Sequence, residues 1–340
     1  MSEARAAEAV RLLLAKAGAT PDIARDVAEN LADAEACGHG SHGLRLTARY
    51  VDLLLADGSV GQARPQILSQ DGPILRIAGN NAFGQVAGAF ATRHGVAVAK
   101  QHGIAAVAVT GSGHFGRNGK WPELAAEAGL ASLHFINAPG APSSVAPPQG
   151  RPARLTANPA AFGLPRRRGD PVIVDFASGD FSVNAIKQAQ ERGEKLPRAS
   201  ILKEDGALSD DPADFLRSAS RAMLPFGGFK GFGLAVVIEL LAGALTGGGT
   251  HKGHAPGDAT NNMLSIYLDA ARFTAEDVYE REMAAFLDRL ETVPGNRSRQ
   301  RRDESRRTGL VLHPSLRDIL RETAAKLSIE ADIAVLLDGR

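Results

Sequence analysis

The sequence is poor in cysteine, in aromatic side chains and in long apolar runs. Cys37 is the only cysteine among 340 residues, so no disulfide can form within the chain. The longest apolar segment, residues 232–245, contains Glu239 and is too short to cross a bilayer. The amino terminus carries no apolar signal core. These absences predict a cytoplasmic protein that does not enter a membrane.

The charges of the chain almost cancel. Lysine and arginine together number 39, aspartate and glutamate 38, and the formal net charge is +1. A chain without a strong charge excess has no general surface for polyanions, so we expect no nucleic-acid partner. The length is sufficient for one large domain or two ordinary ones.

Hydrophobic periodicity places strands in the middle of the chain and helices at both ends. We expect strands at residues 74–77, 104–109, 132–136, 171–176 and 264–268. We expect helices at residues 3–17, 21–36, 44–56, 85–102, 121–128, 232–245, 275–290 and 314–326. This order predicts an α/β protein in which a mixed domain, residues 73–272, interrupts a discontinuous helical domain, residues 1–72 and 273–340.

One short stretch combines an imidazole with two guanidinium groups. His42 precedes the expected helix 44–56, and Ser41 is a candidate N-cap. Arg45 and Arg49 follow His42 at i+3 and i+7, positions that share one helical face. Such a face could give a proton to a reacting oxygen and hold a carboxylate. The alternative is a locally capping histidine beside solvated arginines.

Residues 111–116 match the pattern G-x-G-x-x-G after an expected strand, but three details argue against a Rossmann fold. The next strand ends at Asn137, where a ribose-binding acid would be required. His114 and Phe115 would crowd the turn that approaches a pyrophosphate. No βαβ unit precedes the pattern. The small neighbours of His114 leave its ring accessible, so it is either a site residue or a turn histidine.

Two further positions carry charge at the ends of apolar elements. Asp175 closes the expected strand 171–176, where it could cap the next turn or orient a histidine. Lys230 follows Gly227-Gly228 at the start of an apolar helix, where a cation opposes the helix dipole. An anionic group is therefore expected near Lys230. The glycine spacing excludes a Walker A motif.

Several motifs occur in an order that is typical of one family. They are Ser41-His42-Gly43, Phe83-Gly84-Gln85, His114-Phe115-Gly116, Thr156-Ala157-Asn158-Pro159, Val174-Asp175-Phe176-Ala177, Gly227-Gly228-Phe229-Lys230-Gly231 and Pro294-Gly295. With these motifs the chain resembles the type 2 malate/L-lactate dehydrogenases, which include ureidoglycolate, sulfolactate and diketogulonate enzymes and a cyclic-imine reductase. The resemblance implies hydride transfer between NAD(P)H and a small 2-oxo acid or cyclic imino acid. It also implies a non-Rossmann, sulfolactate dehydrogenase-like fold and a homodimer.

The resemblance also implies roles for individual residues. His42, with Ser41 beside it, would give and accept the proton, Asp175 would belong to the same catalytic group, and His114 matches an acid/base histidine of some members. Arg45, Arg49 and Asn158 would bind the substrate, and no metal site is implied. The expected cofactor contacts are Val174, Asp175, Phe176, Ala177, Phe229, Lys230, Gly295, Asn296 and Arg297.

Departures from the family pattern surround these positions. The family commonly has arginine four residues after the histidine, where this chain has Leu46, so Arg45 or Arg49 would supply the clamp. Asn184-Ala185 replaces the usual Gly-Lys. These changes leave the substrate open and keep a catalytically silent, metabolite-binding relative as an alternative. A hydrolase using Ser41 and His42 is disfavoured, because adjacent residues do not easily place the hydroxyl on the ring nitrogen and no G-x-S-x-G elbow occurs.

Arginines favour NADP over NAD as the cofactor. A 2′-phosphate needs cationic donors, and Arg297 and Arg299 follow the turn at Pro294. No acidic residue near this turn is placed to hold a free ribose hydroxyl pair. The rival interpretations are an arginine cluster at residues 166–168 and a solvated helix surface.

Overall fold

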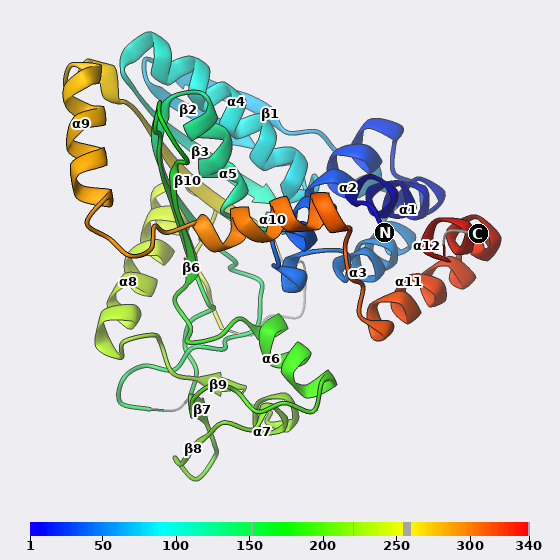
Figure 1. The fold of residues 1–340 in the computed structure, drawn as a ribbon. Coiled ribbons are helices and arrows are strands. Elements are labelled where there is room, and N and C mark those ends of the chain that lie inside the picture. Colours follow the sequence, from blue (N-terminus) through cyan, green and yellow to red (C-terminus); the bar gives the residue numbers. More distant parts are fainter. Residues whose placement is uncertain (151, 220, 254–259, 339–340) are drawn as a thin grey trace.

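A seven-stranded mixed sheet forms the centre of the computed structural model, which describes residues 1–150, 152–219, 221–253 and 260–338 (Figure 1). The strand order is β1-β2-β3-β10-β4-β5-β6, in which β2 and β3 are parallel and the other neighbours antiparallel. The strands are β1 (Gln66–Asp71), β2 (Ile74–Ala78), β3 (Ile104–Ser112), β4 (Leu130–Asn137), β5 (Pro159–Leu164), β6 (Val172–Ala177) and β10 (Asn261–Asp269).

All five expected strands are confirmed as β2, β3, β4, β6 and β10, and two strands of this sheet, β1 and β5, were missed. Every residue of β1 is exposed, so this edge strand shows no apolar alternation. β5 begins at Pro159 and contains Gly163, residues that argue against a strand. The late strand β10 lies between β3 and β4.

The helices and helical turns are α1 (Glu3–Lys16), α2 (Pro21–Ala36), η1 (Gly40–His42), α3 (Leu46–Ala56), η2 (Gly58–Gly61), α4 (Gly84–His102), α5 (Lys120–Glu127), α6 (Val183–Glu191), α7 (Pro212–Arg217), α8 (Phe229–Glu239), η3 (Leu240–Leu245), η4 (Ala270–Arg272), α9 (Glu276–Leu287), α10 (Asn296–Thr308), α11 (Pro314–Lys326) and α12 (Glu330–Asp338). The expected helix 232–245 is therefore α8 followed by η3, a π-helical turn. Among the described residues, no helix has the length and apolarity that crossing a bilayer requires.

Helices cover both faces of the central sheet. α4 and α5 pack on one face, where Trp121 and Tyr267 are fully buried. Gly95 allows the close approach of α4, because a Cβ there would lie 2.3 Å from the Tyr267 ring. α8 packs on the other face, where Ile238 contacts the cluster that contains Phe135 and Leu264. The sheet is thus the middle of three layers.

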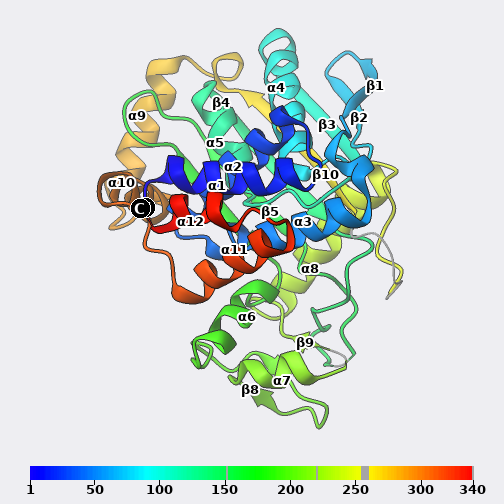
Figure 2. The same ribbon diagram turned by 90° about the vertical axis from the view of Figure 1, so that its right-hand side faces the viewer.

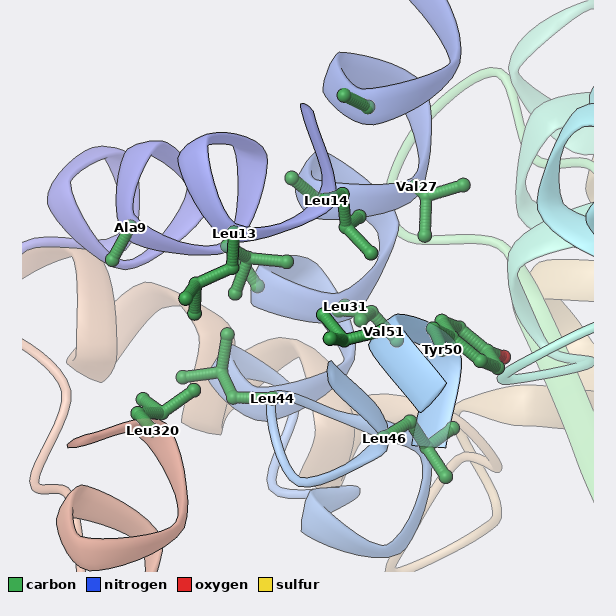
Figure 3. Packing of buried hydrophobic residues seen from close by; sticks show 14 of the residues in the cluster. Ala9, Leu13, Leu14, Val27, Leu31, Leu44, Leu46, Tyr50, Val51 and Leu320 are labelled. Carbon is green, nitrogen blue, oxygen red and sulfur yellow. The ribbon is translucent and has the colours of Figure 1, made fainter. Parts of the chain in front are cut away.

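The two ends of the chain share a second core. α1, α2, α3, α11 and α12 gather on one side of the molecule (Figure 2). Leu13, Leu31, Leu44 and Leu320 point into one cluster (Figure 3), and all are at most 1% exposed. α9 instead lies at the turn after β5, where Tyr279 donates to the carbonyl oxygen of Pro165. The proposed boundaries at residues 72 and 272 stay a prediction.

A small third unit lies below the sheet in Figure 1 and consists of α6, α7 and the three-stranded antiparallel sheet β8-β7-β9. Its strands, β7 (Ile201–Leu202), β8 (Leu208–Ser209) and β9 (Ala222–Met223), are only two residues long. Ile186, Phe215 and Met223 form its core. The three strands were not expected, because two-residue strands are too short to show periodicity.

Candidate active site

A pocket of about 670 Å³ lies where η1, the ends of β4 and β6, and the small third unit meet. Chain segments that are far apart in the sequence supply its walls. Its polar and charged lining includes His39, Ser41, His42, Arg49, His114, Asn118, Ser143, Asn158, Asp175, Asn184, Lys187, Arg221 and Asn261. All four expected catalytic residues are therefore among the residues that line one cavity.

The rings of His42 and His114 stack in this pocket, with centroids 5.5 Å apart and an interplanar angle of 14°. The hydroxyl of Ser41 lies 2.9 Å from Nδ1 of His42. Burial, followed by the nearby charge of Arg117, lowers the pKa of His42 to about 4. No described residue bonds Nε2 of His42, so this atom is available to a ligand in the pocket.

The protonation state of His114 is set by two donors to one nitrogen. The amide of Gly116 donates to Nδ1 over 3.3 Å, and the hydroxyl of Tyr50 lies 3.2 Å from the same atom. Gln85 donates to the Tyr50 oxygen, so the Tyr50 hydrogen is free to point at His114. The hydrogen-bond network therefore assigns the neutral ring its proton on Nε2. Burial, together with the charges of His42 and Arg49, lowers the pKa of His114 to about 3.

The expectation that His42, Arg45 and Arg49 share one helical face is wrong. His42 belongs to the short turn η1, and α3 begins only at Leu46, with Arg45 rather than Ser41 as its N-cap residue. Arg45 forms an ion pair with Glu191 at 2.7 Å and lines a different, smaller hollow. Arg49 lines the main pocket and has no ion-pair partner among the described residues.

Asp175 does not orient either histidine. Its Oδ2 accepts a hydrogen bond from the Gly119 amide over 2.7 Å, and among the described residues it bonds neither His42 nor His114. Asp175 is solvent-exposed where it lines the pocket. The protein packed around the pocket nevertheless desolvates its carboxyl group and raises its pKa, although the bond from Gly119 opposes the shift. Asp175 therefore ties β6 to the start of α5 and lines the pocket.

The reason given against a Ser41–His42 hydrolase is also wrong, since the two adjacent residues do form a hydroxyl–imidazole contact of 2.9 Å. η1 makes this possible, because its tight backbone turn brings the two side chains together. Asn158, expected to bind substrate, is only 1% exposed. Its amide nitrogen donates to Glu239 and to the Ala235 carbonyl oxygen, so its side chain is already occupied.

Sequence reasoning missed two cations that line the pocket. Lys187 lies on α6 one turn after Asn184, whose amide donates to the Ser41 carbonyl oxygen over 2.9 Å. Arg221 precedes β9 and has the unusual backbone angle φ of 34°. Neither cation has an ion-pair partner in the described part of the chain. Recognising α6 from its Ser182 N-cap would have revealed Lys187.

The expected cofactor contacts divide between the pocket and its surroundings. Asp175, Phe176 and Ala177 line the pocket, but Val174 does not. The turn at Gly295 lies beside β6, where the Ile173 amide donates to the Pro294 carbonyl oxygen.

Arg297 follows this turn and is exposed, and Asn296 accepts a hydrogen bond from Arg299. Phe229 and Lys230, at the start of α8, are exposed and line no described pocket. Near the turn, Arg299 forms an ion pair with Asp170 at 3.3 Å. Asp170 is thus an acid near the turn, but its carboxylate is paired with arginine, so the expectation that no acid is placed to hold a ribose hydroxyl pair stays a prediction.

The chemistry of the pocket fits a nicotinamide cofactor together with a small acid. Arg49, Lys187 and Arg221, which pair with no acid in the part of the chain that the structure describes, offer positive charge to phosphates or carboxylates. Phe176 and Ala177 add apolar wall beside the histidines, as expected of small-molecule sites. Among the described residues, no cluster of three histidine, cysteine or acidic side chains could hold a metal ion.

Comparison with known proteins gives a consistent result. A family model described as malate/L-lactate dehydrogenase matches residues 1–321. L-lactate dehydrogenase of Cupriavidus necator is 37% identical over 292 residues, which cover 85% of this chain and 84% of the relative.

Two solved structures extend the comparison. The crystal structure of delta1-piperideine-2-carboxylate reductase from Pseudomonas syringae pv. tomato has a TM-score of 0.84, with 30% identity over 95% of this chain and 99% of that one. Sulfolactate dehydrogenase of Methanocaldococcus jannaschii, at 24% identity, has a TM-score of 0.85 over 98% of both chains. The second likeness supports the fold alone, and it confirms the expected non-Rossmann, mixed-sheet class.

Proposed function

Since the chain belongs to the malate/L-lactate dehydrogenase family, we propose that it transfers a hydride between NAD(P)H and a small 2-oxo acid, and catalyses the reverse oxidation. The observation that carries this proposal is the pair of stacked histidines beside an unpaired arginine in one pocket. Reducing a carbonyl requires a proton for the oxygen that becomes an alkoxide, and an imidazole can deliver it.

His42 is the proton carrier of the pair. Its Nδ1 faces a hydroxyl, which can either donate or accept, so Ser41 tolerates both protonation states of the ring. His114 lacks this freedom, because a proton on its Nδ1 would oppose the donors from Gly116 and Tyr50. His114 therefore stays neutral and donates from Nε2 to the same substrate oxygen.

The other residues bind and orient the reactants. The nicotinamide ring supplies or accepts the hydride when the cofactor is bound. Arg49 holds the substrate carboxylate with its forked donors. Asp175, Phe176 and Ala177 contact the bound cofactor. The Gly295 turn beside β6 continues this contact surface toward Asn296 and Arg297. Asn158 supports the wall instead of contacting the substrate.

NADP is the proposed preferred cofactor. Arg297 is exposed beside the Gly295 turn and has no ion-pair partner among the described residues. A free guanidinium at this place can bind a 2′-phosphate. Asp170 could instead hold a ribose hydroxyl pair, but its ion pair with Arg299 opposes that role.

We also propose a homodimer. α8 and η3 are apolar on their outward side, where Phe229 is 72%, Val237 49%, Leu240 53% and Leu245 69% exposed. A helix that is apolar on all sides is normally buried, and a second copy of the chain would cover this face. Sedimentation analysis tests this, and a monomer at assay concentration would refute it.

The reductase relative makes cyclic imino acids the second candidate substrate class. The decisive experiment incubates the purified protein with NADPH or NADH and a panel of 2-oxo acids and cyclic imino acids, and records cofactor oxidation. Turnover with a member of either class supports the proposal and names the class. Cofactor binding without any turnover would indicate the catalytically silent relative instead.

A further inference from the structure

A carboxylate outside the pocket sits at the centre of a hydrogen-bond network. Glu239 ends α8 and is only 5% exposed. Its Oε1 accepts from Asn137 Nδ2 over 2.8 Å and from the His251 amide over 2.7 Å, and its Oε2 accepts from Asn158 Nδ2 over 2.6 Å. No cation in the described part of the chain pairs with it. Burying a carboxylate costs free energy unless hydrogen-bond donors replace the lost water, and here three neutral donors do so.

The first branch from Glu239 leads to the turn that carries His114. The side-chain oxygen of Asn137 accepts from Asn262 Nδ2 over 3.0 Å. Asn262 in turn accepts, through its own side-chain oxygen, from the Gly111 amide over 2.9 Å. Gly111 lies near the end of β3, just before the glycine-rich turn that carries His114. This chain of amides fixes the position of that turn relative to α8.

The second branch reaches the strand that carries Asp175. Asn158 lines the pocket, and its carbonyl oxygen accepts from the Ser178 amide over 3.2 Å. Ser178 directly follows β6 and is fully buried. Since Glu239 holds the Asn158 side chain, it also fixes the backbone that accepts from Ser178. The wall formed by β6 is thereby tied to the same carboxylate.

The third branch reaches the loop after β4. His251 Nδ1 lies 3.1 Å from the Pro139 carbonyl oxygen, so Nδ1 is the donor and Nε2 the acceptor. The Ser143 hydroxyl, which lines the pocket, therefore donates to Nε2 over 2.7 Å. Three walls of the pocket thus converge on one buried side chain.

The helix itself is distorted where this carboxylate lies. The π-helical turn η3 begins directly after Glu239, and such turns are rare and frequently occur at functional sites. Gly243 in this turn has no room for a side chain, because a Cβ would lie 2.6 Å from Asn137 Nδ2 and 2.6 Å from the Gly249 carbonyl oxygen. The distortion lets the helix approach the donors of Glu239 closely.

We infer that Glu239 is a positioning residue of the active site. It holds the His114 turn, the β6 wall and the Ser143 loop in register by accepting one hydrogen bond from each branch. Its effect on turnover rests on the proposed function, whereas its effect on the order of the three walls does not. The two consequences can therefore be measured separately.

The test replaces the carboxylate by its isosteric amide, Glu239→Gln. In either orientation the new NH2 group faces a donor, Asn158 on one side or Asn137 and His251 on the other, so at least one branch is released. We expect kcat to fall at least about tenfold, the scale of lost positioning. Hydrogen exchange should accelerate in the released branch, at Ser178 when the NH2 group faces Asn158, or at Gly111 and His251 when it faces Asn137 and His251.

Ser265→Ala is the matched control, because it removes a hydrogen bond from buried His134 on the central sheet without touching the network. It should lose stability yet keep kcat and the exchange rates of the three amides. Wild-type kcat in Glu239→Gln, or faster exchange confined to α8, would overturn the inference.

A second variant covers the case in which Glu239→Gln does not fold. Asn262→Ala removes the branch to Gly111 and one bond to the Gly248 carbonyl oxygen, and it leaves the bonds of Glu239 to Asn158 and His251 in place. Exchange should therefore accelerate at Gly111 and not at Ser178, with a smaller fall in kcat. Unchanged exchange at Gly111 would overturn the inference. If the wild-type protein shows no turnover at all, the proposed function fails, while the exchange pattern still decides the role of Glu239.

Discussion

His42 and His114 stack in the pocket with nearly parallel rings, their centroids 5.5 Å apart. Two imidazoles this close do not readily carry charge together, and the proximity of His42 contributes to the lowered pKa of His114. Their other contacts differ. The Ser41 hydroxyl beside His42 can donate or accept a hydrogen bond, whereas the Gly116 amide beside His114 can only donate one. Under the proposed function, the stack therefore holds one mobile proton, which we assign to His42.

Replacing His42 by Asn should preserve cofactor binding and lower kcat by roughly a hundredfold or more, the scale of lost general acid–base catalysis. His114→Asn is the parallel variant, and it should lose less, because an asparagine amide can still donate a hydrogen bond. Steady-state kinetics with a fluorescence titration of the cofactor would test both. If His114→Asn is nearly inactive while His42→Asn stays active, His114 and not His42 is the proton carrier.

The pH dependence follows from the direction of the His42 shift. Burial lowers its pKa to about 4, so the ring of the free protein is neutral at neutral pH. Reduction uses the protonated ring, whose population falls tenfold per pH unit above that value. Between about pH 6 and pH 8, kcat/KM for reduction should therefore decline with rising pH, while kcat/KM for oxidation stays level. A level profile for reduction would contradict this assignment.

Arg49→Ala should weaken substrate binding by about 1.5–3 kcal/mol, the usual loss for a charge-assisted hydrogen bond. This corresponds to a roughly 10- to 150-fold higher apparent dissociation constant. Arg45→Ala is the comparison, because Arg45 is paired with Glu191 and lines another hollow. Inhibition by a non-reacting carboxylate analogue measures both affinities. Equal losses in the two variants would place the clamp elsewhere.

Cofactor choice depends on Arg297. Arg297→Ala should reduce the ratio of kcat/KM for NADPH to that for NADH by about tenfold or more, because a 2′-phosphate loses a charged donor. Arg307→Ala is the control on the same helix, ten residues and therefore about 15 Å further along. A strong preference for NADH that is unchanged in Arg297→Ala would refute both the proposed preference for NADP and the proposed role of Arg297.

Much of the fold could be predicted because its strands are buried. The apolar, β-branched run in β3 and the buried β4 gave clear patterns, and their order along the chain indicated a mixed domain between helices. β1 escaped because it is exposed along its whole length, and β7, β8 and β9 because each has only two residues. Periodicity is visible only where one face of an element is buried over several residues.

For the site, the motifs predicted which side chains line the same pocket, but they did not predict the hydrogen-bond partner of each one. His42, His114 and Asp175 line one pocket, yet the bond from Asp175 goes to the Gly119 amide. Arg45 and Arg49 were both expected to bind the substrate because their spacing from His42 fits one helical face. That argument assumed a helix that already includes Arg45, whereas α3 begins at Leu46. Tyr50, which helps to fix the tautomer of His114, had no sequence signal, since the contact spans 64 residues.

The most direct test follows the hydride itself. NADPH carrying deuterium on the transferred position of its nicotinamide ring is incubated with the protein and the best substrate of the panel, and the product is analysed by mass spectrometry. Our account predicts one deuterium on the carbon that bore the oxo or imino group, in equal amount to the cofactor oxidised. Cofactor oxidation without label in the product would contradict it.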